Sequence, residues 1–108
     1  MSDDYLPKQF TQFNEAHPKV AEALGVLGAT ISAQGPLDAK TRHLIKLGIA
    51  TAIQSQGAVK SHVRQALLAG ANRAEIEHAM LLSITTNGFP VAVAALQWAQ
   101  EVFDARSQ

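Results

Sequence analysis

The sequence predicts an all-α domain of about six helices, and three observations support this prediction. Apolar residues recur at helical spacing along most of the 108 residues. Gly and Pro separate these stretches, and no alternating run of Val, Ile or Thr lies between turn residues, as a strand would require. The 47% hydrophobic and 17% charged composition is that of a globular protein, and the length fits one domain, residues 1–108.

Two helices are expected before residue 35. A short one runs from about Pro7 to Ala16 and ends at His17-Pro18, because the residue before a proline avoids the α region. The next begins at Pro18 and ends before Gly35-Pro36. It carries one apolar stripe of Val20, Leu24, Leu27 and Ile31.

The third helix is expected over residues 39–53, with Asp38 as its N-cap. Its apolar residues cover more than one side, which predicts a central helix buried on most sides. After a polar break, a fourth helix is expected over 58–69, with Gly70 in the left-handed conformation at its end. The inward residues expected in this fourth helix are Val59, Val63, Ala66 and Leu67.

Asn72 and Glu75 form a capping-box pattern that begins a fifth helix, and the polar run 85–88 ends it. Pro90 opens a last helix to about Phe103, in which Trp98 is expected to pack in the core or an interface. Apolar coverage is generous for a monomer of this size. We therefore expect helix faces buried between subunits of a homo-oligomer.

Charge and hydropathy exclude several partners. Lys plus Arg and Asp plus Glu both number 9, which argues against nucleic acid and anionic membranes as partners. No apolar stretch reaches the roughly 18 residues of a membrane span, and the acidic start Met1–Asp4 is unlike a signal peptide. The chain has no cysteine, so packing rather than disulfides stabilises it, and we expect a cytoplasmic protein.

Three stretches resemble the carboxymuconolactone decarboxylase family. Residues 37–47, LDAKTRHLIKL, are similar to the family's L-D-x-K-T-R-E-L-x-x-L helix, and residues 60–67, KSHVRQAL, to its K-S-H-V-R-x-A-L segment. Gly88-Phe89-Pro90 and the alanine-rich helix after it resemble the end of the family pattern. The resemblance covers residues 18–103. It implies the alkylhydroperoxidase-D-like (AhpD-like) helical fold, in trimers or hexamers with helices interlocked between subunits.

The family resemblance implies two kinds of chemistry. One branch reduces peroxides with a C-x-x-C pair, and the other opens and decarboxylates a lactone acid of aromatic catabolism. His62 matches the family histidine, but the two cysteine positions hold Ser55 and Ala58, and neither can supply a thiolate. His43 stands where the family has a glutamate. Ser55 and Gln56 are candidate hydrogen-bonding residues for a substrate, or else simply polar loop residues.

His62 and His43 are the candidate catalytic residues. Histidine titrates near neutral pH, so His62 suits proton transfer, and His43 could donate a proton to an enolate. Lys46, with Arg42 or Arg64, could bind a substrate carboxylate. The alternatives are a partly buried His62 bonded to a backbone carbonyl, and a His43 that lies in a helix interface.

A metal site and a cofactor are not expected. His43, His62 and His78 lie on three predicted helices, but no two are at i, i+4 and there is no His-Glu-x-x-His pattern. His78 is expected on a helix surface, and His17 is expected to be exposed before its proline.

These observations predict a cofactor-free lyase acting on a small carboxylated lactone or β-keto acid, with His62 as the proton-transfer residue. The alternative is a non-catalytic, oligomeric ligand-binding relative, which the histidine at position 43 would suit. An AhpD-like peroxidase is disfavoured because the chain has no cysteine.

Overall fold

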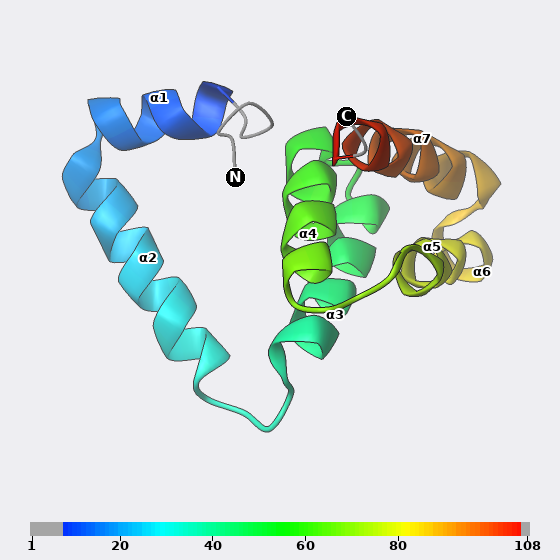
Figure 1. Ribbon diagram of the computed structural model, residues 1–108, viewed down its shortest axis with the longest axis horizontal. Coiled ribbons are helices and arrows are strands. Elements are labelled where there is room, and N and C mark those ends of the chain that lie inside the picture. The colour runs from blue at the N-terminus through cyan, green and yellow to red at the C-terminus, as the bar shows by residue number, and fades with distance from the viewer. Residues whose placement is uncertain (1–7, 107–108) are drawn as a thin grey trace. The chain divides into compact units, whose positions relative to one another are not determined.

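The computed structural model describes residues 8–106 and confirms the all-α prediction. Within this range lie six helices of nine or more residues and one of four (Figure 1). The chain divides into two compact units, residues 1–37 and 38–108. None of the helices in the described part is long and apolar enough to cross a membrane.

The first unit contains helices α1 (Lys8–Ala16) and α2 (Pro18–Ser32). The expected first residue of α1, Pro7, lies outside the described residues. Pro18 opens α2 as predicted, and His17 between the two helices is exposed. Neither helix buries a residue, and the predicted stripe of α2 is more than half exposed throughout: Val20, Leu24, Leu27 and Ile31.

The second unit contains the remaining helices, and α3 and α4 lie side by side in it (Figure 1). Helix α7 packs against α3, α4 and α5. The bounds are α3 (Ala39–Ala52), α4 (Gln56–Leu68), α5 (Arg73–Leu81), α6 (Ile84–Asn87) and α7 (Phe89–Arg106).

Side-chain caps fix where these helices begin. The Asp38 carboxylate accepts a 2.8 Å hydrogen bond from the Thr41 backbone N–H, which confirms it as the N-cap of α3. Asn72 and Glu75 form the predicted capping box at the start of α5. Gly70, with φ of +99°, ends α4 in the left-handed region, which a residue with a Cβ adopts only at a cost.

The core of the second unit is built from small and medium-sized apolar side chains. Of the predicted inward residues of α4, Val59, Val63 and Ala66 are fully buried, and Leu67 is partly buried against the core. Trp98 is partly buried against this core, as expected. The buried cluster is Leu47, Ala50, Val59, Val63, Ala66, Ala71, Ile76, Met80, Ala95, Ala99 and Val102.

Three expectations about the second unit were wrong. Helix α3 is not buried on most sides, because the side that carries Ile45, Ile49 and Ile53 faces away from the core and is 47–68% exposed. Helix α4 begins at Gln56 because Ser55 caps it. The polar run after α5 does not simply end that helix: the backbone turns at residues 82–83 and forms the short helix α6.

Candidate functional site

Helices α3 and α4 bring the two predicted catalytic histidines into contact. The Nδ1 atoms of His43 and His62 lie 3.4 Å apart, a long hydrogen-bonding contact. The ring centroids are 5.6 Å apart and the ring planes are tilted by 34°, so the rings meet at their nitrogen edges rather than stacking. Both side chains are partly buried. We call these two residues the histidine pair.

Burial and nearby cations keep the histidine pair neutral. The pKa of His62 falls from its usual value of 6.5 to about 4, chiefly because burial disfavours the charged ring and also because His43 and Lys46 repel a proton there. Burial, with Lys46 and Arg42, likewise lowers the pKa of His43. At neutral pH both rings are therefore uncharged, which is the form that can accept a proton.

Of the predicted carboxylate-binding residues, Lys46 is the one whose charge acts on both rings. It is partly exposed on α3, one turn after His43. Arg42 adjoins His43 in the chain and is also partly exposed. Arg64 on α4 is only 6% exposed. The structure thus associates Lys46 and Arg42 with the histidine pair, and places the Arg64 side chain in the protein interior.

Ser55 and Gln56 lie at the start of α4, seven and six residues before His62. The Ser55 hydroxyl accepts a 3.4 Å hydrogen bond from the Ala58 backbone N–H, so it caps the helix. Gln56 is exposed in the first turn. The residue before them, Gln54, has a φ of +57° and donates from Nε2 to the Val91 carbonyl at 3.2 Å, which ties this turn to α7.

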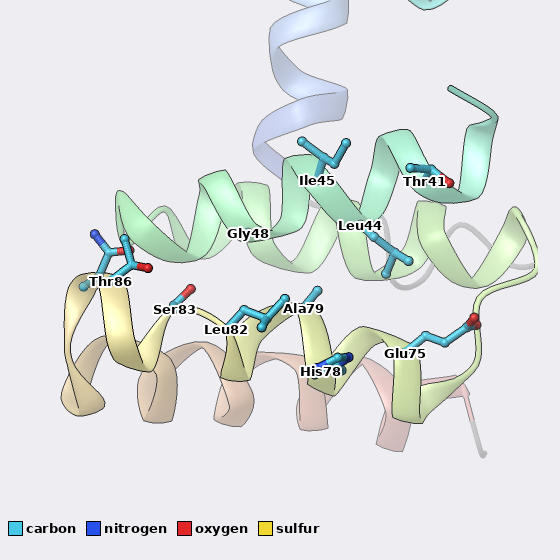
Figure 2. A pocket seen from close by; sticks show the side chains of 11 residues that line it. Thr41, Leu44, Ile45, Gly48, Glu75, His78, Ala79, Leu82, Ser83 and Thr86 are labelled. Atoms are coloured by element: carbon cyan, nitrogen blue, oxygen red, sulfur yellow. The ribbon is translucent and has the colours of Figure 1, made fainter. Parts of the chain in front are cut away.

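Sequence reasoning did not predict the groove that lies between α3 and α5–α6 (Figure 2). It is open and has a volume of about 560 Å³. None of the seven predicted site residues lines it. Its walls are formed by Thr41, Leu44, Ile45, Gly48, Glu75, His78, Ala79, Leu82, Ser83, Thr86 and Asn87.

The groove has apolar side chains on both walls, and the Glu75 carboxylate that lines it is engaged by neighbouring groups. Leu44 and Ala79 point toward each other across it (Figure 2). Glu75 completes the capping box and accepts from Lys40 at 3.0 Å. The Asn72 backbone N–H, and then Lys40, lower the pKa of Glu75, so its carboxyl stays ionised. His78 is exposed at the edge of the groove, which fits its predicted surface position.

A periodic signal for the groove was present in the sequence. Its α3 wall uses positions 41, 44, 45 and 48, and its α5 wall uses 75, 78, 79 and 82, the same i, i+3, i+4, i+7 spacing. That spacing indicates one side of a helix. It cannot indicate that two such sides face each other with space between them.

Within residues 8–106, no third His, Cys, Asp or Glu lies close enough to the histidine pair to complete a metal-binding group. The pair consists of two neutral imidazoles beside cationic side chains. Such a group can accept, hold or donate a proton, and its cations favour a negatively charged ligand.

Comparison with family models gives a match over residues 18–101 to the carboxymuconolactone decarboxylase family. Two relatives carry no functional description. An uncharacterized protein of Haemophilus influenzae is 32% identical over 62 residues, 57% of this chain and 55% of its own length. An uncharacterized 15.0 kDa protein of Paracoccus denitrificans, from the nqo9-nqo10 intergenic region, is 41% identical over 81 residues, which are 70% of this chain and 58% of its own length. The chain thus spans under two thirds of these relatives.

Two crystal structures share the fold. A carboxymuconolactone decarboxylase family protein from Legionella pneumophila, in its apo form, has a TM-score of 0.75 and 24% identity, over 94% of this chain and 98% of that one. A protein from Burkholderia xenovorans LB400, named after the same decarboxylase, has a TM-score of 0.72 and 24% identity, over 94% of this chain and 83% of that one. At this identity the likeness concerns the fold.

Proposed function

Because this chain belongs to the carboxymuconolactone decarboxylase family, we propose that it is a lyase that removes carbon dioxide from a small carboxylated lactone or β-keto acid. The proposal needs no cofactor, since the histidine pair can perform the proton transfers. The observation that carries it is the 3.4 Å contact between His43 and His62. By the sequence resemblance, His62 corresponds to the family histidine and His43 to the family glutamate.

The substrate carboxylate binds beside Lys46 in this proposal. Lys46 is partly exposed, and its positive charge acts on both rings. A carboxylate there forms a charge-assisted hydrogen bond. Arg42, Arg64, Ser55 and Gln56 remain candidate substrate ligands, and alanine variants would test each of them. The burial of Arg64 makes it the weakest of these candidates.

The reaction follows from the charges at the histidine pair. The bond between the substrate carbon and its carboxylate breaks, carbon dioxide leaves, and the electron pair moves into the neighbouring carbonyl group as an enolate. A cation fixed nearby stabilises that enolate. His62 then gives its N–H proton to the carbon and regains a proton from solvent through His43. General acid–base catalysis of this kind contributes about 10²–10⁴-fold in rate.

A homo-oligomer is part of the same proposal. The apolar stripe of α2 is more than half exposed and no residue of α1 or α2 is buried, which leaves these helices without a core of their own. Ile49 on α3 and Ile53 at its C-cap are exposed as well. Other copies of the chain would cover such surfaces, and a trimer or hexamer would do so symmetrically. Sedimentation as a monomer at micromolar concentration would contradict this part.

An ultraviolet assay with γ-carboxymuconolactone, followed by other carboxylated lactones and β-keto acids, tests the function. We expect turnover by the wild type and a loss of about 10²–10⁴-fold in His62→Ala. His78→Ala removes an exposed histidine at the groove and should retain nearly full activity. Turnover that survives in His62→Ala would reject the mechanism.

A second candidate function rests on His43 itself. A basic residue in place of the family acid would suit a relative that binds small acids without converting them. Calorimetric binding of these acids with no turnover by the wild type would favour this candidate. A peroxidase reaction remains disfavoured, because the chain has no cysteine to cycle between thiol and disulfide.

A further inference from the structure

The contact between His43 and His62 joins the same atom of each ring. The two Nδ1 atoms are 3.4 Å apart. In a neutral imidazole, each nitrogen is either an N–H donor or a bare acceptor. Two N–H groups at this distance would repel each other, and so would two bare nitrogens. The contact is favourable only when one ring carries hydrogen on Nδ1 and the other does not.

We propose that His43 and His62 hold opposite tautomers around one shared Nδ1 proton, so that each ring is a positioning residue that decides which nitrogen of the other carries hydrogen. The contact is partly buried, so water competes less for these atoms than at an open surface. Burial and the nearby cations also lower the pKa of both rings, which removes the doubly protonated state in which both Nδ1 atoms carry hydrogen.

The proposal determines what the pair offers to a ligand. A neutral ring has one N–H. The ring that donates from Nδ1 therefore has a bare Nε2, and the ring that accepts at Nδ1 has hydrogen on Nε2. The histidine pair thus contains one basic Nε2 and one acidic Nε2–H, although both rings are the same residue type and both are uncharged.

This arrangement can move a proton without a change in net charge. The bare Nε2 accepts a proton from one substrate atom, the shared proton crosses from one Nδ1 to the other, and the second ring releases its Nε2 proton to another substrate atom. One proton enters and one leaves, and the two rings end neutral with their tautomers exchanged. Only this use of the pair rests on the proposed lyase function; the tautomers themselves do not.

Nitrogen-15 NMR of the uniformly labelled full chain, at neutral pH and without substrate, tests the proposal. We expect one ring of the pair to carry hydrogen on Nδ1 and the other to carry it on Nε2. Free histidine prefers the Nε2–H tautomer, so two Nε2–H rings would overturn the proposal. An imidazolium signal from either ring at neutral pH would overturn it as well.

Variants separate this pairing from a merely structural contact. When the partner of the Nδ1–H ring is replaced by alanine (His43→Ala or His62→Ala), that ring should revert to the Nε2–H tautomer. Asparagine at the same position places an amide oxygen near the lost Nδ1 and should preserve the Nδ1–H tautomer. An unchanged tautomer in the alanine variant would contradict the proposal. His78→Ala, which lies outside the pair, should change neither ring.

The two proposals fail in different experiments. Opposite tautomers in a protein that converts no carboxylated substrate would reject the lyase function and leave the pairing intact. Turnover that depends on His62 in a protein with two Nε2–H rings would reject the pairing and leave the lyase function intact. If an alanine variant does not fold, as judged by circular dichroism, the wild-type tautomers alone decide.

Discussion

The two sides of helix α3 differ in what they offer chemically. The side facing α4 carries His43, in contact with His62, and both rings have a lowered pKa. The side facing α5 and α6 lines the groove, with Leu44 and Gly48 on its wall. One side thus carries perturbed titratable groups, and the other lines the groove.

The comparison teaches that a hollow surface and reactive chemistry need not coincide. In the groove, the pKa of Glu75 is lowered, and its carboxylate is already engaged by the Asn72 backbone and by Lys40. That engagement is structural, because it caps α5 and links it to α3. The side chains at the histidine pair have no comparable capping role, which favours the pair as the reaction centre.

The largest effect is expected on stability, when the buried core residue of α3 is truncated. Leu47 is fully buried in the core, so Leu47→Ala should lower the free energy of unfolding by about 2–5 kcal/mol. Urea denaturation would measure this loss. Ile49→Ala on the same helix, at 57% exposure, should change stability by about 0.5 kcal/mol or less in dilute protein. Equal losses in the two variants would contradict the core assigned here.

Removing the cation beside the histidine pair should have the next largest effect. Lys46 lowers the pKa of both rings, so Lys46→Met should raise both pKa values. It should also raise the KM of a carboxylated substrate by roughly 10–100-fold, since a charge-assisted hydrogen bond is lost. Lys60→Met is the matched control, because the Lys60 ammonium pairs with Glu101 at 2.7 Å. An unchanged KM in Lys46→Met would remove Lys46 from the site.

The smallest effect is expected from a substitution in the wall of the groove. A Cβ added at Gly48 would meet no atom within 4 Å, and helical Gly→Ala replacement stabilises by roughly 0.5–1 kcal/mol. Gly48→Ala should therefore raise the melting temperature slightly and leave turnover unchanged. Gly70→Ala, at a φ of +99°, should be destabilised instead. If Gly48→Ala reduced turnover as much as Lys46→Met, the groove would be part of the reaction centre.

Local signals predicted most of the helices. Asp38, Asn72 and Gly70 fixed helix ends because capping depends on residues within a few positions in the chain. The periodicity of α4 predicted its buried face correctly. The same kind of periodicity in α2 predicted a stripe that is exposed in this chain. Spacing identifies an apolar face, but what covers that face depends on tertiary or quaternary contacts.

The candidate site was predicted in part. His62 and His43 were selected from the family pattern, but their 3.4 Å contact depends on how α3 packs against α4, which spacing does not determine. Burial of Arg64 depends on the same packing. The groove was missed because it requires two helix sides, 34 residues apart in the chain at positions 41 and 75, to face each other.

The neutral state of His62 also predicts how stability changes with pH. An unfolded histidine has a pKa near 6.5, and the folded value is about 4. Between these values the unfolded chain binds a proton that the folded chain does not. The contribution of His62 to stability therefore falls as pH drops from about 6.5 to 4, and is constant above 6.5. The His62→Gln variant should therefore lose less stability than the wild type as the pH falls from about 6.5 to 4.

The central claim is that the reactive centre is a pair of histidines held neutral between α3 and α4. An NMR titration of the His62 ring protons in the full chain, from neutral pH to below 4, tests this claim most directly. The account predicts a midpoint near 4 and a rise of this midpoint in Lys46→Met. A midpoint near 6.5, unchanged in that variant, would show an ordinary solvated histidine and would contradict the account.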